Sequence, residues 1–349
     1  MTTVLDCIER IPQCLQTMLD HYDERMAGLK QYGEGKQIKE VIFVASGSSY
    51  NAAFTAHQFF ENLGIETQYY YPNVFVHYHQ HFHQDALYVM ISQGGNTRLV
   101  YEAAKKLKKH GCMTASITES SDALIAKSVD VALDMGSVHE EFMYRTLGYS
   151  TTVATCTFVA MTLAEINKTE FDKKAILEDF QTMIINLPKI EENTLNWYEK
   201  HRFSLMHKQH MMFAGAGELW PVANEADIKV MEMVPLITRS FELEEFIHGP
   251  QNAFDASTAF FLFVKQGEDE EKAEKIARFL KEQIGFCCVS SPHARDARDL
   301  EIPIVSKHFN PLEYITAMQV LAYKLADDHG RDLSRPVNAS VKQYIVKTV

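Results

Sequence analysis

The stretch Val41-Ile42-Phe43-Val44-Ala45-Ser46-Gly47-Ser48-Ser49 opens a pattern that recurs along the 349-residue chain. A short apolar run rich in β-branched residues leads into a glycine and serine loop, which a helical segment follows. The same order returns at 86–91, where Ser92-Gln93-Gly94-Gly95 precedes a helix expected over about 96–110. Strands that are apolar along their whole length and alternate with helices predict a parallel sheet covered on both faces.

The pattern restarts in the second half of the chain. Gly47 and Gly217 are 170 residues apart, and Gly94 and Gly267 are 173 apart. A nearly constant offset over two consecutive strand-loop-helix units predicts duplicated domains. The simpler alternative is that any two α/β units look alike, but that does not account for two units in register.

The composition is that of a globular protein, with 46% hydrophobic and 23% charged residues. A net charge of −12 argues against nucleic acid and anionic membranes as partners, because both bind basic surfaces. Six scattered cysteines without a CxxC pair predict reduced thiols in a cytoplasmic protein. No apolar run reaches the roughly 18 residues of a membrane helix, and acidic residues interrupt the N-terminus where a signal peptide is apolar.

The two halves differ at the loops where a ligand would bind. Hydroxyl groups follow two successive strands of the first half: Ser46, Ser48, Ser49, Ser92 and Thr97. The second half carries an acidic run at 268–271 instead. Hydroxyls beside helix N-termini can donate to a phosphate, and ligands of open α/β sheets bind at the carboxyl ends of the strands. We therefore expect an anion in the first half, although helix capping is the simpler role for each serine alone.

A second candidate cluster lies on an otherwise apolar segment that predicts a helix. Glu225, Lys229 and Glu232 lie there at i, i+4 and i+7, which places all three on one face. A solvated face with ion pairs is the simpler interpretation. A buried helix, however, must pair its charges or use them. His248, in the turn His248-Gly249-Pro250, follows 16 residues after Glu232.

Taken in order, the segments 45–50, 92–97 and 225–250 resemble the SIS-domain (sugar isomerase) family. The plan is similar to the double-SIS isomerase module of the glucosamine-6-phosphate synthases and to the stand-alone fructosamine-6-phosphate deglycases. The resemblance implies an α/β fold of two tandem SIS-type domains, each a parallel sheet between helical layers. The N-terminal, phosphate-binding domain is expected at 1–165 and the C-terminal, catalytic domain at 166–349.

The resemblance also implies site residues for the phosphate. These are Ser48, Ser49, Ser92, Gln93, Gly94 and Thr97. Gly94 stands where the synthases have a serine, so a backbone amide must serve there. The segment 140–146 is bulkier than its counterpart, and Gly148 replaces a lysine, so the contacts to the rest of the sugar differ from the family pattern.

Catalytic roles follow from the same resemblance. Glu232 is expected to move a proton between the first and second carbons of the sugar, and His248 to act as acid and base at the ring or the leaving group. Lys229 and Glu225 would bind or polarise substrate oxygens. A carboxylate suits this work because the carbon next to a carbonyl or imine yields its proton to a base within hydrogen-bond reach.

The family pattern adds a tail contact and a partner. Lys342 and Lys347 are both candidates for a C-terminal lysine over the substrate. The histidine of the family often enters the site of a neighbouring subunit, which implies a homodimer with shared active sites. We expect no cofactor and no metal, although four histidines alternate in the sequence: His77, His79, His81 and His83.

The favoured function is deglycation of a fructosamine 6-phosphate, releasing a sugar 6-phosphate and an amine or amino acid. Aldose–ketose isomerisation and deamination of an amino-sugar phosphate share the same proton transfer and stay open as alternatives. No glutaminase segment or N-terminal cysteine precedes the repeats, so we do not expect glutamine-dependent amide transfer. A non-catalytic sugar-phosphate sensor is a further alternative, but the first forty residues are acidic and too short for a DNA-binding module.

Overall fold

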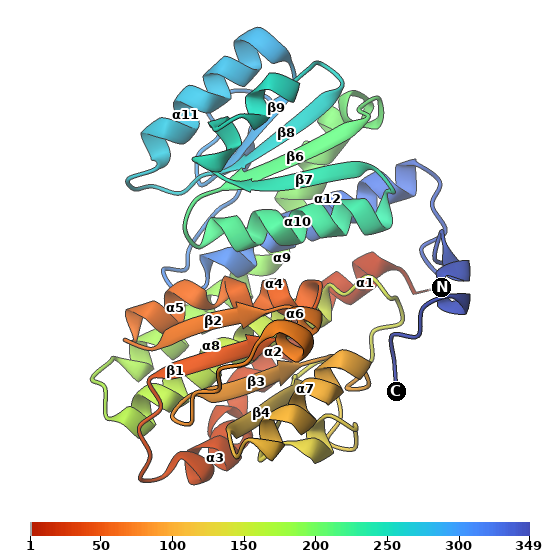
Figure 1. Ribbon diagram of the computed structural model, residues 1–349. Coiled ribbons are helices and arrows are strands. Elements are labelled where there is room, and N and C mark those ends of the chain that lie inside the picture. The colour runs from red at the N-terminus through yellow and green to blue at the C-terminus, as the bar shows by residue number, and fades with distance from the viewer. Residues whose placement is uncertain (1) are drawn as a thin grey trace. The chain divides into compact units, whose positions relative to one another are not determined.

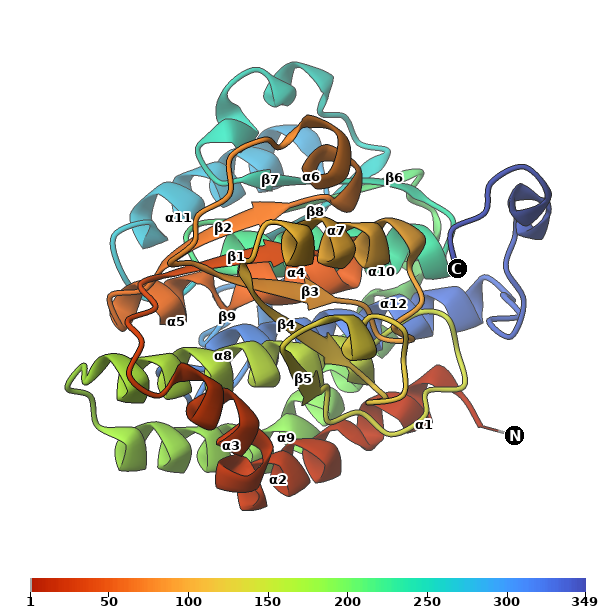
Figure 2. The same ribbon diagram turned by 60° about the horizontal axis from the view of Figure 1, so that its bottom comes forward.

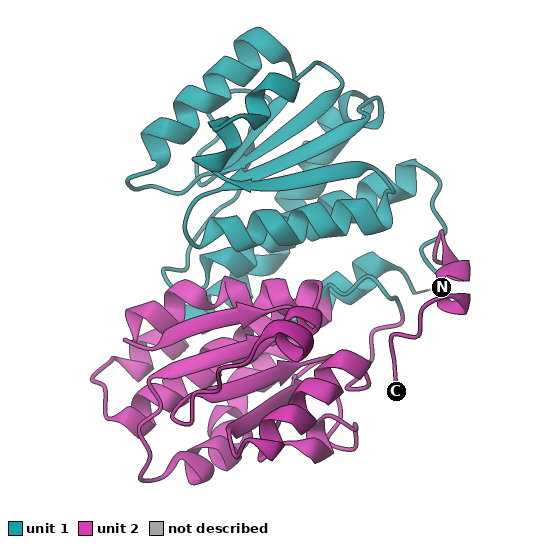
Figure 3. Cartoon of the chain, in the orientation of Figure 1, with its two compact units in different colours: residues 1–12, 142–146, 178–334 teal, residues 13–141, 147–177, 335–349 magenta. Residues whose placement is uncertain are grey.

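The computed structural model describes residues 2–349 and divides them into two compact units (Figures 1 and 3). Unit 1 comprises residues 1–12, 142–146 and 178–334. Unit 2 comprises residues 13–141, 147–177 and 335–349. Each unit is built around a parallel five-stranded sheet of its own.

The sheet of unit 2 has the strand order β2-β1-β3-β4-β5. Its strands are β1 (Glu40–Val44), β2 (Glu66–Tyr70), β3 (Leu87–Ile91), β4 (Met113–Thr118) and β5 (Val131–Asp134). The central strand β3 is buried at all five positions, which explains its uninterrupted apolar sequence. The order reverses between β1 and β3, so a crevice at their carboxyl ends is the expected place for a ligand.

Helices cover both faces of this sheet (Figure 2). They are α2 (Ile11–Asp20), α3 (Tyr22–Gly33), α4 (Ser48–Thr55), α5 (His57–Asn62), α6 (Pro72–Tyr78), α7 (Arg98–Lys109) and α8 (Leu147–Asn167). Ile42, Tyr88 and Met90 pack with α6 and α7 on one face. Helices α4 and α5 pack with α8 on the other.

Helix α8 is long and apolar enough to cross a bilayer, which the sequence analysis did not anticipate. All of its apolar window is buried inside the protein. Several threonines of the helix donate to the preceding turn, as Thr151 does to the carbonyl of Leu147 at 3.2 Å and Thr155 to that of Thr151 at 2.9 Å. The helix is therefore the central core element of unit 2.

The sheet of unit 1 repeats the same topology, with the order β10-β9-β8-β6-β7. Its strands are β6 (His210–Gly215), β7 (Ile237–Glu242), β8 (Thr258–Phe263), β9 (Cys287–Ser291) and β10 (Leu300–Glu301). When β6 to β10 are matched in sequence with β1 to β5, the two orders are identical. The predicted fold, two tandem α/β domains with parallel sheets, is confirmed.

Unit 1 also has three layers (Figure 1). Its helices are α1 (Val4–Glu9), α9 (Lys173–Met206, which begins in unit 2), α10 (Leu219–Met233), α11 (Glu270–Phe279) and α12 (Asn310–Asp328). Helices α10 and α12 pack on one another, and Tyr314 of α12 contacts Phe263 of β8 at a ring distance of 6.2 Å. Phe260 of the same strand points to the opposite face, in a core cluster that includes Ile276 of α11.

Candidate functional site

The first hydroxyl-bearing turn connects β1 to α4. Gly47 has a φ of 56°, a left-handed conformation that favours glycine and that turns the chain sharply into the helix. Ser48 and Ser49 form the first turn of α4 and are half-buried. The earliest helical bond runs from the amide of Asn51 to the carbonyl of Gly47 at 3.0 Å, so the amides before it point out of the helix end.

The second turn connects β3 to α7. The hydroxyls of Ser92 and Thr97 lie 2.8 Å apart and close the turn across its two ends. Gly95 has a φ of 63°, and a side chain there would collide with Ala123, since a Cβ would lie 2.2 Å from that residue's Cβ. The turn is therefore fixed by packing and presents its hydroxyls in one arrangement.

The two turns meet at one edge of the unit 2 sheet. Strands β1 and β3 are parallel neighbours, with Val44 paired to Met90. The predicted phosphate-binding residues consequently gather at the carboxyl ends of two adjacent strands, at the reversal of strand order: Ser48, Ser49, Ser92, Gln93, Gly94 and Thr97. Hydroxyls and free helical amides at such an edge can donate to a phosphate.

Gln93 packs against Gly148, the position at which the resembling synthases have a lysine. A Cβ on Gly148 would lie 2.2 Å from Oε1 of Gln93, so a larger residue here would displace this buried amide from its observed position. The carboxylate of Glu140, itself buried, accepts from the amides of Leu147 and Gly148 at 3.2 Å and caps α8. Sequence reasoning missed Glu140, because the capping carboxylate lies seven residues before the helix.

The C-terminal tail runs beside the second turn. Thr348 forms an antiparallel bridge with Thr97. The amide of Arg98 donates to the carbonyl of Lys347 at 3.0 Å, and the amide of Val349 to that of Asn96 at 3.0 Å. Of the two candidate lysines, the structure brings Lys347 to this turn by its backbone. Lys342 lies in the exposed turn η5 (Ala339–Gln343).

The predicted catalytic cluster lies in unit 1, on α10. Glu225 and Lys229 have no exposed side-chain surface, whereas 45% of the side chain of Glu232 is exposed. Nζ of Lys229 lies 3.6 Å from Oε1 of Glu225 and 3.0 Å from Oε2 of Glu232. The lysine is thus buried between two carboxylates, and its charge is balanced there.

Helix α10 carries Glu232 away from the strand ends. Glu232 lies in its last turn, 13 residues after Leu219, which is about 20 Å along the helix axis. The helix begins directly after the loop of Gly217, at the carboxyl end of β6, but Glu232 lies at its other end.

His248 lies on the other side of the same sheet. It is exposed between the short turns η2 (Glu245–Ile247) and η3 (Pro250–Ala253). Phe246 and Phe254, which flank it, pack in the core cluster of α11, opposite the face of α10 and α12. The structure therefore brings Glu225, Lys229 and Glu232 together but does not bring His248 to them within unit 1.

The alternating histidines take separate positions. His77 is in the last turn of α6, and His79 stacks on Phe75 with a ring distance of 4.9 Å. His83 lies 2.6 Å from a carboxylate oxygen of Glu40, which raises the pKa of the histidine through that hydrogen bond and charge. The histidines thus have separate local roles: His79 packs on an aromatic ring, and His83 forms an ion pair.

Part of the chain matches a known protein family, and most of it matches curated relatives. The family model of the SIS domain matches residues 36–164. The glutamine–fructose-6-phosphate aminotransferase of Vibrio cholerae is 25% identical over 318 residues, covering 86% of this chain and 51% of that protein. The chain spans about half the length of the curated relatives it matches.

Two solved structures have a similar fold over 95% or more of this chain. A protein of Clostridium difficile 630, provisionally described as a phosphosugar isomerase, has a TM-score of 0.91 at 20% identity, covering 100% of this chain and 99% of that one. The glucosamine-6-phosphate deaminase of Thermotoga maritima has a TM-score of 0.74 at 25% identity, covering 95% and 98%. These similarities support the fold of two SIS-type α/β domains.

Proposed function

We propose that this chain, whose residues 36–164 match the SIS-domain family model, is a phosphosugar enzyme of the isomerase type. The observation that carries the proposal is the triad on α10, in which the buried Lys229 and Glu225 hold the half-exposed Glu232. An ordinary surface ion pair has both side chains in water, whereas Lys229 has no accessible surface and lies between two carboxylates. Such a group is costly to bury and is expected where chemistry uses it.

The substrate phosphate binds at the edge of unit 2 formed by the two hydroxyl-bearing turns. Ser48 and Ser49 offer hydroxyls and unpaired helical amides, and Ser92 and Thr97 offer two more hydroxyls that already lie 2.8 Å apart. The amide of Gly94 takes the place of a serine in the resembling synthases. The net charge of −12 does not oppose this binding, because local donors decide it.

Glu232 is the base of the reaction. It removes a proton from the carbon next to the carbonyl carbon, and the electron pair moves through the new double bond onto the carbonyl oxygen. The same carboxylate then returns the proton to the neighbouring carbon. Lys229 stabilises the negative charge that develops on the oxygen, and its contact of 3.0 Å with Glu232 holds that carboxylate in position. General acid–base catalysis of this kind contributes about 10²–10⁴ in rate.

The preferred substrate is a fructosamine 6-phosphate. Moving the proton from the first to the second carbon converts the ketoamine to an imine at the first carbon. Water adds to that imine, and the amine leaves with a proton, so that a sugar 6-phosphate and a free amine are formed. His248 would donate the proton to the leaving nitrogen. Six free, buried cysteines and a phosphorylated substrate support a cytoplasmic location.

The likeness to the Thermotoga maritima glucosamine-6-phosphate deaminase favours one alternative, the deamination of an amino-sugar phosphate. Simple aldose–ketose isomerisation needs the same base. A panel of fructosamine 6-phosphates with different amino acids, together with glucosamine 6-phosphate and fructose 6-phosphate, separates the three. We expect release of sugar phosphate from the fructosamines. Isomerisation of fructose 6-phosphate alone would contradict deglycation.

The active site requires a second copy of the chain. Within unit 1 the sheet separates His248 from α10, and the histidine is exposed on a turn. A homodimer in which His248 of one copy enters the site of the other resolves this separation. Dimers with closed two-fold symmetry are the commonest oligomers, and two equivalent sites would result.

A further inference from the structure

The end of α10 carries an unbalanced negative charge. Two carboxylates, those of Glu225 and Glu232, share one ammonium group, that of Lys229. The carbonyl groups at the end of a helix add a partial negative charge, which destabilises a carboxylate there. Residues 230–233, which form the last turn, include no basic side chain. A positive charge from another element would therefore stabilise the turn that bears Glu232.

Arg331 reaches the end of α10 from the end of α12. Its Nε donates to the carbonyl of Met233 at 3.3 Å, and Met233 follows Glu232 directly in the sequence. Gly330 precedes the arginine with a φ of 66°, the left-handed conformation at which many helices end. The amide of Arg331 then donates back to the carbonyl of Ala326 at 3.0 Å. The backbone of Arg331 is thus fixed by α12, and its side chain joins the ends of two packed helices.

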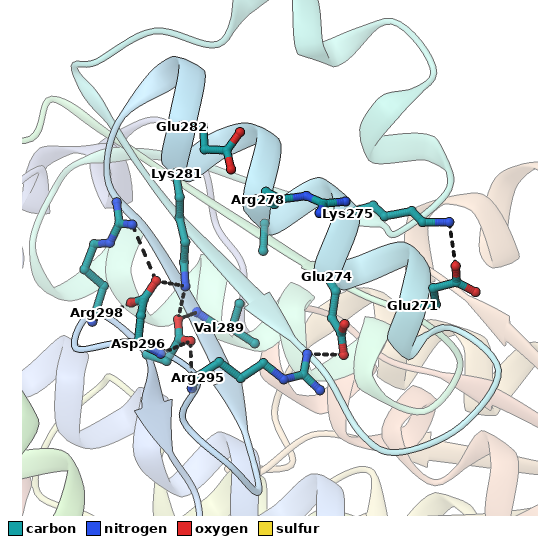
Figure 4. A pocket seen from close by; sticks show the side chains of 12 residues that line it. Glu271, Glu274, Lys275, Arg278, Lys281, Glu282, Val289, Arg295, Asp296 and Arg298 are labelled. Atoms are coloured by element: carbon teal, nitrogen blue, oxygen red, sulfur yellow. Dashed lines mark hydrogen bonds and ion pairs between the residues drawn. The ribbon is translucent and has the colours of Figure 1, made fainter.

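Several other cations of unit 1 are neutralised by carboxylates. In the cavity beside α11, Lys281 lies 2.7 Å from the carboxylate of Asp296, and Arg298 lies 3.4 Å from the same group (Figure 4). At the end of α12, the guanidinium of Arg202 donates to both oxygens of Asp328, at 2.9 and 2.5 Å. Such pairs fix the positions of side chains but leave little charge to act on a neighbouring element.

The charge of Arg331 is not neutralised in this way. Arg331 forms no salt bridge with any of residues 2–349, and its Nη2 is buried without a hydrogen-bond partner among them. A buried guanidinium N–H without an acceptor is costly, so its retention calls for a role. The full positive charge of Arg331 therefore acts on the end of α10, which its Nε contacts.

We propose that Arg331 is a positioning residue that stabilises Glu232 by its charge. The hydrogen bond to Met233 directs the guanidinium to the last turn of α10, and the charge offsets the negative end of the helix, so that the carboxylate keeps its place there. The inference rests on the proposed function, in which Glu232 is the base. A base must be held close to its productive geometry, because a displacement of about 1 Å can reduce the rate about a hundredfold.

Two substitutions separate the charge from the hydrogen bond. Arg331→Gln keeps an N–H donor for the carbonyl of Met233 but has no charge, whereas Arg331→Lys keeps the charge. The readout is incorporation of deuterium from the solvent into fructose 6-phosphate by the full chain, with the dissociation constant measured separately. Arg331→Gln should lower the exchange rate at saturating substrate about tenfold, the effect of losing a favourable charge at a helix end, and should leave the dissociation constant unchanged. Arg331→Lys should retain most of the rate.

The matched control is Arg202→Gln, which breaks the ion pair with Asp328 at the end of the same helix, α12. It should lower the thermal midpoint without lowering the exchange rate. An Arg331→Gln variant as active as wild type would overturn the inference and leave the proposed reaction intact. An equal loss in Arg331→Lys, or weaker substrate binding in place of slower exchange, would overturn it too. A wild type that exchanges no hydrogen would overturn the proposed function, and this inference with it.

Discussion

At the residue scale, Gly148 determines where the amide of Gln93 can lie. A Cβ at position 148 would come within 2.2 Å of Oε1 and 2.7 Å of Cδ of Gln93. The colliding atoms are the end of a flexible side chain, so it can move while the backbone stays. From the sequence, we could see only that Gly148 stands where the resembling synthases have a lysine. The compensating contact could not be predicted, because it joins residues 55 positions apart in the sequence.

Gly148→Ala is expected to displace Gln93 from the edge of the two turns and to weaken phosphosugar binding about tenfold, with a small change in the free energy of unfolding. The measurements are the dissociation constant of fructose 6-phosphate and the thermal midpoint. Gln93→Ala should cause a similar loss, and the double variant should not lose the sum of both. Additive losses would contradict a role for Gly148 that acts through Gln93.

At the element scale, two carboxylates hold the loop between β10 and α12. Asp179 of α9 accepts from the amides of Lys307 and His308 at 3.0 and 2.8 Å. Glu313 of α12 accepts from the amides of Val305 and Ser306 at 3.1 and 3.2 Å. This loop follows a carboxyl end of the unit 1 sheet, and the hydrogen bonds to the two carboxylates fix its position.

Burial raises the pKa of Glu313 to about 7, despite the opposing effect of its hydrogen bonds to Asn186, Val305 and Ser306. The folded state therefore keeps a proton that the unfolded chain loses near its ordinary value of 4.5. The contribution of Glu313 to stability should fall as the pH rises from about 4.5 to 7, by up to about 3 kcal/mol.

The check is the free energy of unfolding of wild type and Glu313→Gln across that pH range. As the pH rises from 4.5 to 7, the free energy of unfolding of wild type should decrease relative to that of the variant. Above pH 7 the difference between the two proteins should be constant. Parallel pH profiles for the two proteins would show that Glu313 does not titrate in this window. The side chain of Asn186 donates to Glu313 at 2.7 Å, and this hydrogen bond should not change the direction of the pH dependence.

Elements also mark where sequence reasoning succeeds. The apolar strands β1, β3, β6 and β8 were predicted because both of their faces are buried. Strands β2 and β7 were not predicted, since each lies at a sheet edge next to one neighbour and is only partly buried. Edge strands carry polar residues such as Gln68 and Arg239, which weaken the apolar signal.

At the scale of the whole molecule, the spacing of 16 positions between Glu232 and His248 in the sequence does not indicate how far apart they lie in space. The strand β7 intervenes, and the chain crosses from the face of α10 to the face of α11. Sequence spacing matched the family pattern but could not reveal this crossing, which depends on how β7 joins the sheet. The proposed homodimer follows from that geometry together with the resemblance.

Mixed dimers test this arrangement. Glu232→Gln and His248→Ala should each be inactive alone, because each lacks one group in both sites. After dissociation and reassociation of an equal mixture, half of the dimers should be mixed and have one intact site each, so about a quarter of wild-type turnover should return. The control is the mixture with Glu192→Gln, an exposed glutamate of α9, in place of Glu232→Gln. The control mixture should be active in any case, because the Glu192→Gln chain keeps both Glu232 and His248. If the mixture of Glu232→Gln and His248→Ala recovers no turnover, active sites are not shared between copies.

The most direct test of the central claim is exchange of carbon-bound hydrogen in deuterated water, with a fructosamine 6-phosphate or fructose 6-phosphate as substrate and mass spectrometry as the readout. Wild type is predicted to introduce deuterium at the first or second carbon. Glu232→Gln should bind the same substrate and introduce none. Exchange at the wild-type rate in Glu232→Gln, or binding without any exchange in wild type, would contradict proton transfer by this carboxylate.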